Sequence, residues 1–381
     1  MIAARLQPLM TRLVLSDQSG FVPGRSTAHN LRTFFAVAGS TAADDDVAAL
    51  FLDATNVFDS LVWEYLFTLL SRVGLSLRFV GWIRLLYTKP VAQLRLNGGI
   101  STPFWVARGT RQGCPRSLLL IAMEPLAPCL RQHYGDRGIP FRQRPFLISM
   151  YADDIALCVR EPRKNLDVLL DEILRFSEFS GITINWSKSV VLPLSSGAVG
   201  FLSRYSIAWA DGRVSYLGVW LSCDVETLWK ANYGTVMSWQ EDRIEMWHPL
   251  PLLLIGRIAI AKMIVLPKIL YLFVNLPLVL AACFLKHLRS AMIRLVWAGR
   301  QPKIAWEKLT LPFELGGLAA PDMELYYYCK QANFAYYWIR PVRYMPHLAP
   351  ENDAVWPDDL MQVFGGLSRP QPRGGYCGVH C

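Results

Sequence analysis

The segment LISMYADDIALCV, residues 147–159, places two adjacent aspartates between two runs of apolar residues. Short apolar runs of this kind predict two strands joined by a hairpin turn that carries the aspartates. The flanks keep Asp153 and Asp154 near a core, where repulsion between two carboxylates is weakly screened. A positive charge is therefore expected close by. A solvated Asp-Asp turn is the alternative.

A third aspartate ends another apolar run, VAALFLDA, about 100 residues earlier. If that strand and the hairpin are neighbours in one sheet, Asp53, Asp153 and Asp154 converge. Three carboxylates in one place require a cation, and a ligand set made of oxygens favours magnesium. Two magnesium ions about 4 Å apart would hold the attacking and leaving oxygens of a phosphoryl transfer.

The net charge of +9 is concentrated in two long tracts, 65–123 and 246–306, that contain no acidic residue. In both tracts Lys and Arg are interleaved with aromatic residues. Positive tracts of this kind suit a polyanionic partner such as a nucleic acid. An ordinary basic surface is the alternative.

The 381 residues exceed what one core usually holds, so two or three subdomains are expected. The eight cysteines are scattered without a Cys-x-x-Cys pair, and no secretory leader precedes them. We expect reduced thiols and an intracellular protein, in the nucleus or the cytoplasm. Cys377, His380 and Cys381 are close in sequence, but a zinc site needs about four ligands.

Residues 249–285 are the most hydrophobic part of the chain. Arg257, Lys262 and Lys268 interrupt the first part. The uninterrupted part, Ile269–Phe284, falls short of the roughly 20 apolar residues that a membrane span needs. We therefore predict buried helices and no membrane partner, with a membrane-spanning segment as the alternative.

The segments around the aspartates resemble, in order, the motifs of reverse transcriptases from LINE-type (non-LTR) retrotransposons. The resemblance covers roughly residues 1–340, and several motifs in the right order are more specific than any one of them. From the N-terminus the segments are DQSGFVPGRSTAHNLR before the palm, the palm motifs FLDATNVFDSLVWEYL, RGTRQGCPRSLLLIAMEPLA, YADDIAL, SGITINWSKS and YLGV, and LPFELGGLAAPDMELYYYCKQANFAYYW after the thumb.

The resemblance implies an α+β fold of the right-hand polymerase type, with partial fingers, an antiparallel-sheet palm and a helical thumb. The chain is accordingly expected to be mainly helical after Tyr216. The implied domains are partial fingers (1–43), a palm with inserted helices (44–215), a thumb (216–300), a post-thumb helical segment (301–345) and a disordered tail (346–381).

For function, the resemblance implies RNA-directed DNA synthesis by two-metal nucleotidyl transfer. Asp53 and Asp153 would hold two Mg2+ ions, and Asp154 would support the site as a further ligand. Lys188 would give a proton to the departing pyrophosphate, with an ordinary surface lysine as the alternative. The implied partners are an RNA template, a DNA primer and deoxynucleotide triphosphates, and no protein partner is indicated.

Other motif positions are assigned to the nucleotide and the duplex by the same resemblance. Phe58 lies five positions after Asp53, where the family places an aromatic ring that excludes a 2′-hydroxyl; a core residue is the alternative. Gly113 would let the backbone approach the incoming base pair. The remaining assignments are Arg111 and Gln112 for nucleotide contacts, Tyr216, Leu217 and Gly218 for the primer grip, and Arg25, Arg257, Lys262 and Lys268 for nucleic-acid binding.

The chain also departs from the family pattern. Compared with the family pattern, the sequence is expected to start after the endonuclease domain and after the fingers segment whose arginine contacts the triphosphate. In the second palm motif Arg116 replaces a leucine, and the helix after Ser117 is two residues short, which is about 200° of helical rotation. Asn56 and Val57 replace a basic and a small residue. An inactive nucleic-acid-binding remnant of a truncated or decayed element is therefore the alternative to an active polymerase.

Overall fold

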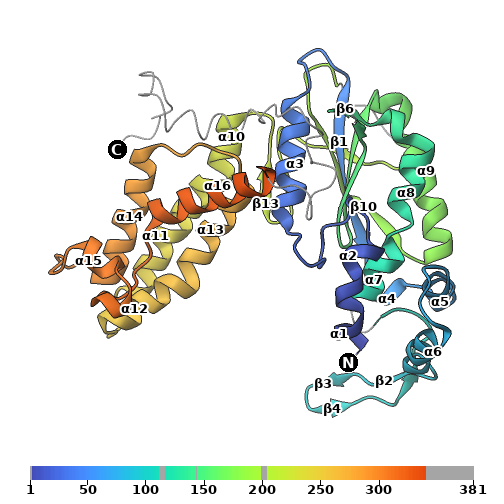
Figure 1. Ribbon diagram of the computed structural model, residues 1–381, viewed down its shortest axis with the longest axis horizontal. Helices are drawn as coiled ribbons and strands as arrows, with labels where there is room; N and C mark the ends of the chain where they lie inside the picture. The colour runs from blue at the N-terminus through green and yellow to red at the C-terminus, as the bar shows by residue number, and fades with distance from the viewer. Residues whose placement is uncertain (1, 111–115, 143, 199–203, 340–381) are drawn as a thin grey trace. The chain divides into compact units, whose positions relative to one another are not determined.

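The computed structural model describes residues 2–110, 116–142, 144–198 and 204–339 (Figure 1). The chain forms two compact units. Unit 1 comprises Met1–Asn30 and Val37–Leu217, whereas unit 2 comprises Leu31–Ala36 and the chain from Gly218 onward. Helix α3 (Thr27–Gly39) contributes residues to both units.

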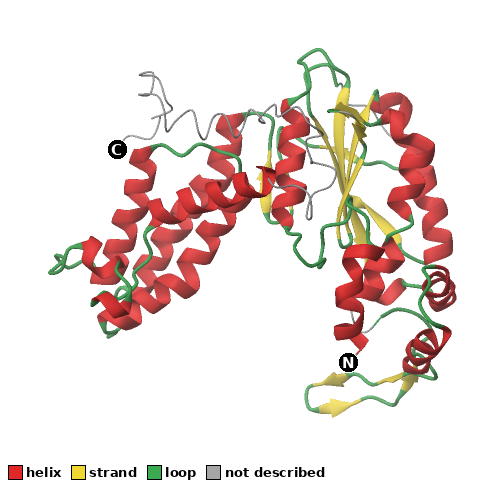
Figure 2. Cartoon of the chain, viewed as in Figure 1, coloured by secondary structure: helices red, strands yellow, loops and turns green. Residues whose placement is uncertain are grey.

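Unit 1 is built around a five-stranded sheet with the strand order β11-β10-β1-β9-β8 (Figure 2). The central strand β1 pairs antiparallel with both of its neighbours. Its first six residues are buried, as expected for an apolar run that is covered on both faces. The strands are β1 (Val47–Thr55), β8 (Ile148–Tyr151), β9 (Asp154–Arg160), β10 (Thr183–Pro193) and β11 (Ala208–Trp209).

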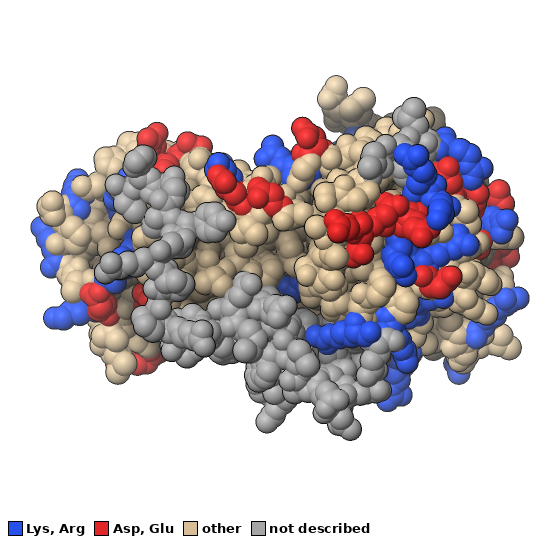
Figure 3. All heavy atoms as spheres, turned by 90° about the horizontal axis from the view of Figure 1, so that it is seen from above, with Lys and Arg blue, Asp and Glu red and all other residues tan. Residues whose placement is uncertain are grey.

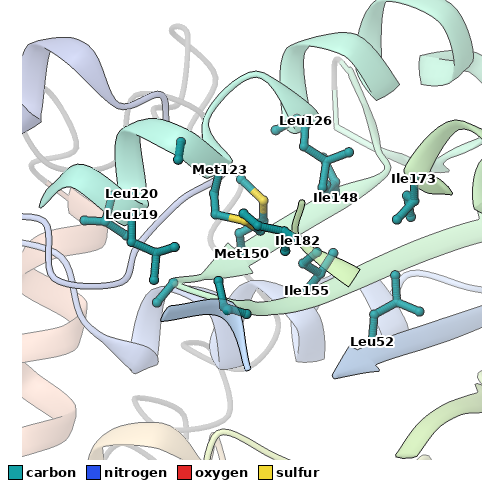
Figure 4. Close-up of a cluster of buried hydrophobic side chains, with 14 of the residues drawn as sticks. Leu52, Leu119, Leu120, Met123, Leu126, Ile148, Met150, Ile155, Ile173 and Ile182 are labelled. Atoms are coloured by element: carbon teal, nitrogen blue, oxygen red, sulfur yellow. The ribbon is translucent and has the colours of Figure 1, made fainter. Parts of the chain in front are cut away.

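Three helices enclose the main core of unit 1 together with the sheet. Figure 4 shows Met123 of the first helix beside Met150 of β8, with Ile155 of β9 and Ile173 of the last helix in the same cluster. The burial of these side chains is what holds the strands that carry the aspartates in register. The helices are α7 (Arg116–Met123), α8 (Leu126–Tyr134) and α9 (Pro162–Ser180).

Helix α7 is the helix that is predicted from the sequence to be two residues short. Every residue from Leu118 to Met123 is at most 2% exposed, so the helix is buried on all sides. A helix that is apolar all round does not depend on one face pointing inward. The structure therefore accommodates the short helix, because a helix buried on all sides needs no particular face to point inward.

The remaining elements of unit 1 are short. The Asn97-Gly98 pair in the sequence predicts a hairpin over residues 91–107. The structure confirms it, and Asn97 and Gly98 have the left-handed φ values of 48° and 81° that such a turn requires. These elements are α1 (Ile2–Leu6), α2 (Met10–Leu13), α4 (Val57–Ser60), α5 (Trp63–Arg72), α6 (Leu77–Leu86), β2 (Val91–Ala92), β3 (Arg95–Leu96), β4 (Gly99–Ile100), β5 (Phe104–Trp105), β6 (Ile139–Phe141), β7 (Arg144–Phe146) and β12 (Val214–Tyr216).

Unit 2 is mainly helical, as predicted for the chain after Tyr216. Arg32 is buried within it and donates hydrogen bonds to the Val274 carbonyl at 2.7 Å and to Gln331 Oε1 at 2.9 Å. The predicted tail 346–381 lies outside the described residues. The elements are β13 (Val219–Leu221), α10 (Val225–Trp229), α11 (Thr235–Trp247), α12 (Leu254–Ile260), α13 (Leu266–Asn275), α14 (Ala282–Trp297), α15 (Trp306–Thr310) and α16 (Met323–Ile339).

Helices α12 and α13 join through a π-helical turn into one helix of 22 residues, Leu254–Asn275. By length and composition this helix could cross a membrane, which differs from the prediction that the region falls short. A core helix of a soluble domain passes the same test, and Ile258, Val265 and Phe273 are buried inside unit 2.

Candidate active site

The aspartate pair lies at the hairpin that joins β8 to β9. Tyr151 and Asp154 form its last residue pair, so the two-residue turn consists of Ala152 and Asp153. The prediction that both aspartates form the turn is therefore wrong by one position, because Asp154 begins β9. Ala152 has a φ of 56°, a left-handed conformation that costs an L-residue about 1–2 kcal/mol. The turn consequently depends on stabilisation from outside the hairpin.

Gln18, from the loop before α3, supplies that stabilisation. Its Oε1 accepts hydrogen bonds from the backbone N–H of Ala152 at 2.7 Å and of Gly20 at 2.8 Å, and its Nε2 donates to the Ala152 carbonyl at 3.0 Å. Gln18 is fully buried, and a Cβ on Gly20 would stand 2.3 Å from the Ala152 nitrogen. Neither residue is among the positions predicted from the sequence, although a glycine in DQSGF is the usual signal of a close backbone approach.

Arg25 holds this loop in place. Its guanidinium donates to the carbonyls of Leu15, of Gln18 at 2.5 Å and of Val14 at 3.2 Å. Burial lowers the pKa of Arg25, and the neighbouring carboxylates of Glu124 and Asp17 oppose that shift. The donors of Arg25 are therefore directed at backbone carbonyls, which corrects the prediction that it serves nucleic acid.

Asp53 reaches the same end of the sheet because β1 and β9 are neighbours, as predicted. Leu52 pairs with Ile155, so Asp53 comes next to Asp154 across the two strands. Burial raises the pKa of Asp154 to about 6, and the charges of Asp153 and Asp53 add to that shift. Burial likewise raises the pKa of Asp153, again with a contribution from Asp53. The three carboxylates thus interact directly through their charges.

This arrangement fits divalent cations. The donors are carboxylate oxygens, which Mg2+ prefers, and a bound cation would relieve the repulsion and the desolvation that raise these pKa values.

Lys188 lies beside Asp53 because β10 bulges at this point. The register of β1 with β10 shifts between Phe51 and Asp53, and residues 186–189 of β10 fall within the shift. The bulge places Lys188 Nζ 3.9 Å from Asp53 Oδ2. In the same bulge, Ser189 Oγ accepts a hydrogen bond from the Asp53 backbone N–H at 3.3 Å. The Lys188 side chain is 70% exposed, so its amine is available to a ligand.

Phe58 lies on α4, directly after the strand that carries Asp53. It is half-buried and packs against the core of unit 1, so the gate and the core interpretations both stay open. Its carbonyl accepts a hydrogen bond from the Thr110 N–H, and a Cβ on Gly109 would lie 2.7 Å from the Asp59 Cα. The segment that leads into RQGCP is thus held against α4. The predicted nucleotide contacts within RQGCP lie outside the described residues: Arg111, Gln112 and Gly113.

The predicted primer grip is a tight hairpin formed by β12 and β13. Leu217 and Gly218 form its turn with left-handed φ values of 47° and 74°. The buried ring of Tyr216 lies 4.8 Å from the ring of Phe51, two positions before Asp53 on β1. Burial raises the pKa of Tyr216, and the charge of Asp154 adds to the shift. Tyr216 therefore packs beneath the strand ends that carry the aspartates.

The basic residues predicted for unit 2 differ from one another in exposure. Arg257 is buried and donates to the carbonyls of Trp247 and His248, each at 3.2 Å, and of Leu250 at 2.7 Å. It closes the turn between α11 and α12, which corrects its prediction as a duplex contact. Lys262 is half-buried and Lys268 is exposed, and both lie over aromatic rings. Figure 3 shows one face of the molecule, on which acidic and basic side chains are interspersed.

Comparison with known proteins connects this geometry to a family. The model of the family described as reverse transcriptase (RNA-dependent DNA polymerase) matches residues 1–221. An uncharacterized 149 kDa protein of transposon TX1 from Xenopus laevis is 31% identical over 230 residues, which cover 58% of this chain and 17% of that protein. A retrovirus-related Pol polyprotein from the type-2 retrotransposable element R2DM of Drosophila melanogaster is 32% identical over 139 residues, or 36% of this chain and 13% of that protein.

Telomerase chains are among the solved structures that match this chain, at low sequence identity. An apo telomerase from Candida tropicalis, truncated from its C-terminal domain, has a TM-score of 0.41 at 12% identity and covers 58% of this chain and 42% of its own. A telomerase from Candida albicans, solved with a fragment of telomeric RNA, has a TM-score of 0.44 at 11% identity and covers 86% of this chain and 50% of its own.

The chain belongs to the reverse transcriptase (RNA-dependent DNA polymerase) family, since the family model matches more than half of it. The curated relatives confirm the resemblance to non-LTR retrotransposon reverse transcriptases, and the chain spans less than a fifth of either relative's length. The expected α+β right-hand polymerase fold is confirmed as well. Membership implies, in general terms, dependence on a divalent metal and binding of a nucleic-acid template.

Proposed function

We propose that this chain is the RNA-directed DNA polymerase of a non-LTR retrotransposon, which extends a DNA primer on an RNA template with deoxynucleotide triphosphates. The observation that carries the proposal is the convergence of Asp53, Asp153 and Asp154 at the adjoining ends of β1 and β9. The carboxylates repel one another, and binding of metal-complexed phosphates would offset that repulsion.

The residues around the aspartates have different roles in nucleotidyl transfer. Asp53 and Asp153 would hold two Mg2+ ions, with Asp154 as a supporting ligand, and the ions supply charge stabilisation for the attacking and leaving oxygens. Lys188, 3.9 Å from Asp53, holds a proton where the pyrophosphate leaves. Phe58, directly after this strand, excludes a 2′-hydroxyl from the sugar site. Tyr216 supports the primer end through its contact with Phe51.

The duplex is held mainly through its phosphates. Lys262 and Lys268 in the helices of unit 2 are the basic positions that stay accessible among those predicted. Affinity for a primer–template should therefore fall with rising salt and carry little sequence information. A polymerase of this kind acts in the nucleus or the cytoplasm, where its RNA template is found.

The test is primer extension by the purified chain with an RNA template, a DNA primer, deoxynucleotides and Mg2+. Asp153→Asn should lower the extension rate by about 10³-fold or more, because the lost charge stabilises the transition state. The matched control is Asp136→Asn, which changes an exposed aspartate in the turn after α8 and should leave the rate unchanged.

Extension by the parent that survives in Asp153→Asn would refute the assignment of the site. A parent that is folded and binds the duplex but does not extend the primer would instead identify the chain as an inactive nucleic-acid-binding remnant. Duplex binding measured by fluorescence anisotropy, with circular dichroism of each variant, separates these two results.

A further inference from the structure

A second cluster of ligand side chains lies between α8 and α9. Cys129 Sγ, His133 Nδ1 and a carboxylate oxygen of Glu172 all lie within 4.8 Å of one another. Cys129 and His133 are four residues apart on α8, a spacing that places both side chains on one helix face. Glu172 comes from α9, which packs beside α8 in the same layer (Figure 1).

The separations match a tetrahedral metal site. With Zn–S and Zn–N bonds of about 2.3 and 2.1 Å, tetrahedral geometry places the sulfur and nitrogen ligands roughly 3.6 Å apart. In this structure Cys129 Sγ lies 3.7 Å from His133 Nδ1 and 3.3 Å from Glu172 Oε1. The three ligand atoms therefore lie at separations at which one ion could be held.

The carboxylate of Glu172 is already oriented for this role. Its Oε1 faces the thiol, whereas its Oε2 accepts hydrogen bonds from the Tyr134 hydroxyl at 3.4 Å and from Arg175 at 3.2 Å. Outer partners of this kind fix a ligating carboxylate in metal sites. Arg175 is 68% exposed and points its charge at the oxygen away from the thiol, so it leaves the ligand position open.

We propose that Cys129, His133 and Glu172 bind one Zn2+ ion, with a water molecule as the fourth ligand. A thiolate and a carboxylate carry two negative charges, which neutralise the ion. The soft sulfur ligand selects zinc over magnesium, so the site is distinct in chemistry from the aspartates. Binding releases the thiol proton to solvent. The ion would join α8 to α9 across the layer that covers the sheet.

The experiment uses the full chain with Cys377→Ser and Cys381→Ser, because the C-terminal Cys-His-Cys sequence could bind metal by itself. Cobalt titration reports sulfur ligation through the thiolate-to-cobalt charge-transfer absorption, and elemental analysis after zinc loading gives the stoichiometry. With excess Mg2+ present to occupy the aspartates, we expect one zinc ion per chain and, in the cobalt titration, a charge-transfer band, together with a zinc-dependent rise in the melting temperature.

Cys129→Ser should abolish the band. His133→Ala should weaken zinc binding by more than the roughly 10–100-fold that loss of an outer partner costs. His133 is exposed, so this variant keeps the test decisive even if Cys129→Ser folds poorly. The matched control, Cys329→Ser, changes an exposed free cysteine on α16 and should bind as the parent does. A parent without the band, or binding that is unchanged in His133→Ala, would overturn the proposal.

Discussion

The β3–β4 and β8–β9 hairpins of unit 1 both have two-residue turns, and these two turns reach the left-handed backbone by different means. The β3–β4 turn is Asn97-Gly98, two residues that adopt positive φ readily, and its strands are exposed. The β8–β9 turn is Ala152-Asp153, in which an alanine adopts a φ of 56°. The first turn is encoded by its own two residues, whereas the second depends on Gln18, 134 positions away in sequence.

The difference shows that residues distant in sequence fix the backbone geometry of the candidate active site. Alanine has little intrinsic preference for a left-handed backbone, so buried hydrogen bonds from another segment fix the geometry of the β8–β9 turn. The segment containing Gln18 is fixed in turn by Arg25 and by Glu124, whose Oε1 accepts from the Leu15 N–H at 2.7 Å. Substitutions that remove buried polar contacts should therefore destabilise the β8–β9 turn, whereas comparable substitutions in the exposed β3–β4 hairpin should have little effect on stability.

The largest expected effect comes from Gln18→Met, which keeps the side-chain volume and removes the hydrogen bonds. The N–H and carbonyl of Ala152 would be left unsatisfied and buried, at a total cost of about 4 kcal/mol. Urea denaturation measures the loss, and primer extension should fall with it. Gln93→Met is the matched control: Gln93 donates to the Ser101 carbonyl in the exposed hairpin, and its replacement should cost less than about 0.5 kcal/mol. Equal losses for the two variants would contradict the comparison.

The second effect is a pH dependence that arises at Glu124. Burial raises the pKa of Glu124 to about 7 from a usual value near 4.5. Because the folded-state pKa is raised, Glu124 makes its full contribution to the free energy of unfolding below pH 4.5, and this contribution is lost as pH rises through about 7. In Glu124→Gln, the pH-dependent decrease in the free energy of unfolding should be smaller by up to about 3 kcal/mol. Urea denaturation at pH 5 and pH 8 measures it.

The control for this pH dependence is Glu178→Gln, which changes an exposed glutamate on α9. Its stability should follow the parent's at both pH values. A Glu124→Gln variant with the parent's full pH dependence would show that Glu124 does not titrate in this range.

A smaller effect is expected for Gly20→Ala, because the added Cβ meets the Ala152 backbone at 2.3 Å. Overpacking of this kind costs about 2 kcal/mol, and it should displace the turn and slow primer extension. Gly135→Ala is the control, since a Cβ there meets nothing within 4 Å. Thermal denaturation of both variants decides the point: a Gly20→Ala protein as stable and active as the control would show that the loop and turn are not held rigidly.

The smallest effect belongs to the exposed hairpin itself. Gly98→Ala places a side chain at a φ of 81°, which costs about 1 kcal/mol. Primer extension should not change, because no contact of the aspartate site depends on this turn. A loss of activity at unchanged stability would show that the exposed hairpin takes part in the reaction.

Local sequence predicted the backbone conformation correctly where that conformation depends on the residue itself and its immediate neighbours. The apolar runs predicted β1, β8 and β9, and the Asn97-Gly98 pair predicted a hairpin turn. The glycine that follows the amphipathic run NLDVLLDEILRFSEFS predicts a helix end, and Gly181 with a φ of 78° does end α9. The neighbouring positions of Asp53 and Asp154 also followed, because antiparallel pairing of two predicted strands brings their ends together. The family motifs supplied the order of these pieces.

Tertiary structure decided the partners of polar groups. Arg25 and Arg257 looked like phosphate contacts in the sequence, yet each donates to three backbone carbonyls. Periodicity reports which side chains are apolar, but it does not report which distant backbone groups lack a hydrogen-bond partner after folding.

The sequence by itself determined the strands, the three aspartates and the class of polymerase to which the chain belongs. Three contacts were decided only by the tertiary structure. Gln18 binds the backbone of the β8–β9 turn, and a bulge places Lys188 beside Asp53. Glu172 lies close to Cys129 and His133. The physical reason is range: strand and turn preferences act over a few neighbouring residues, whereas these contacts join residues 39 to 135 positions apart in the sequence.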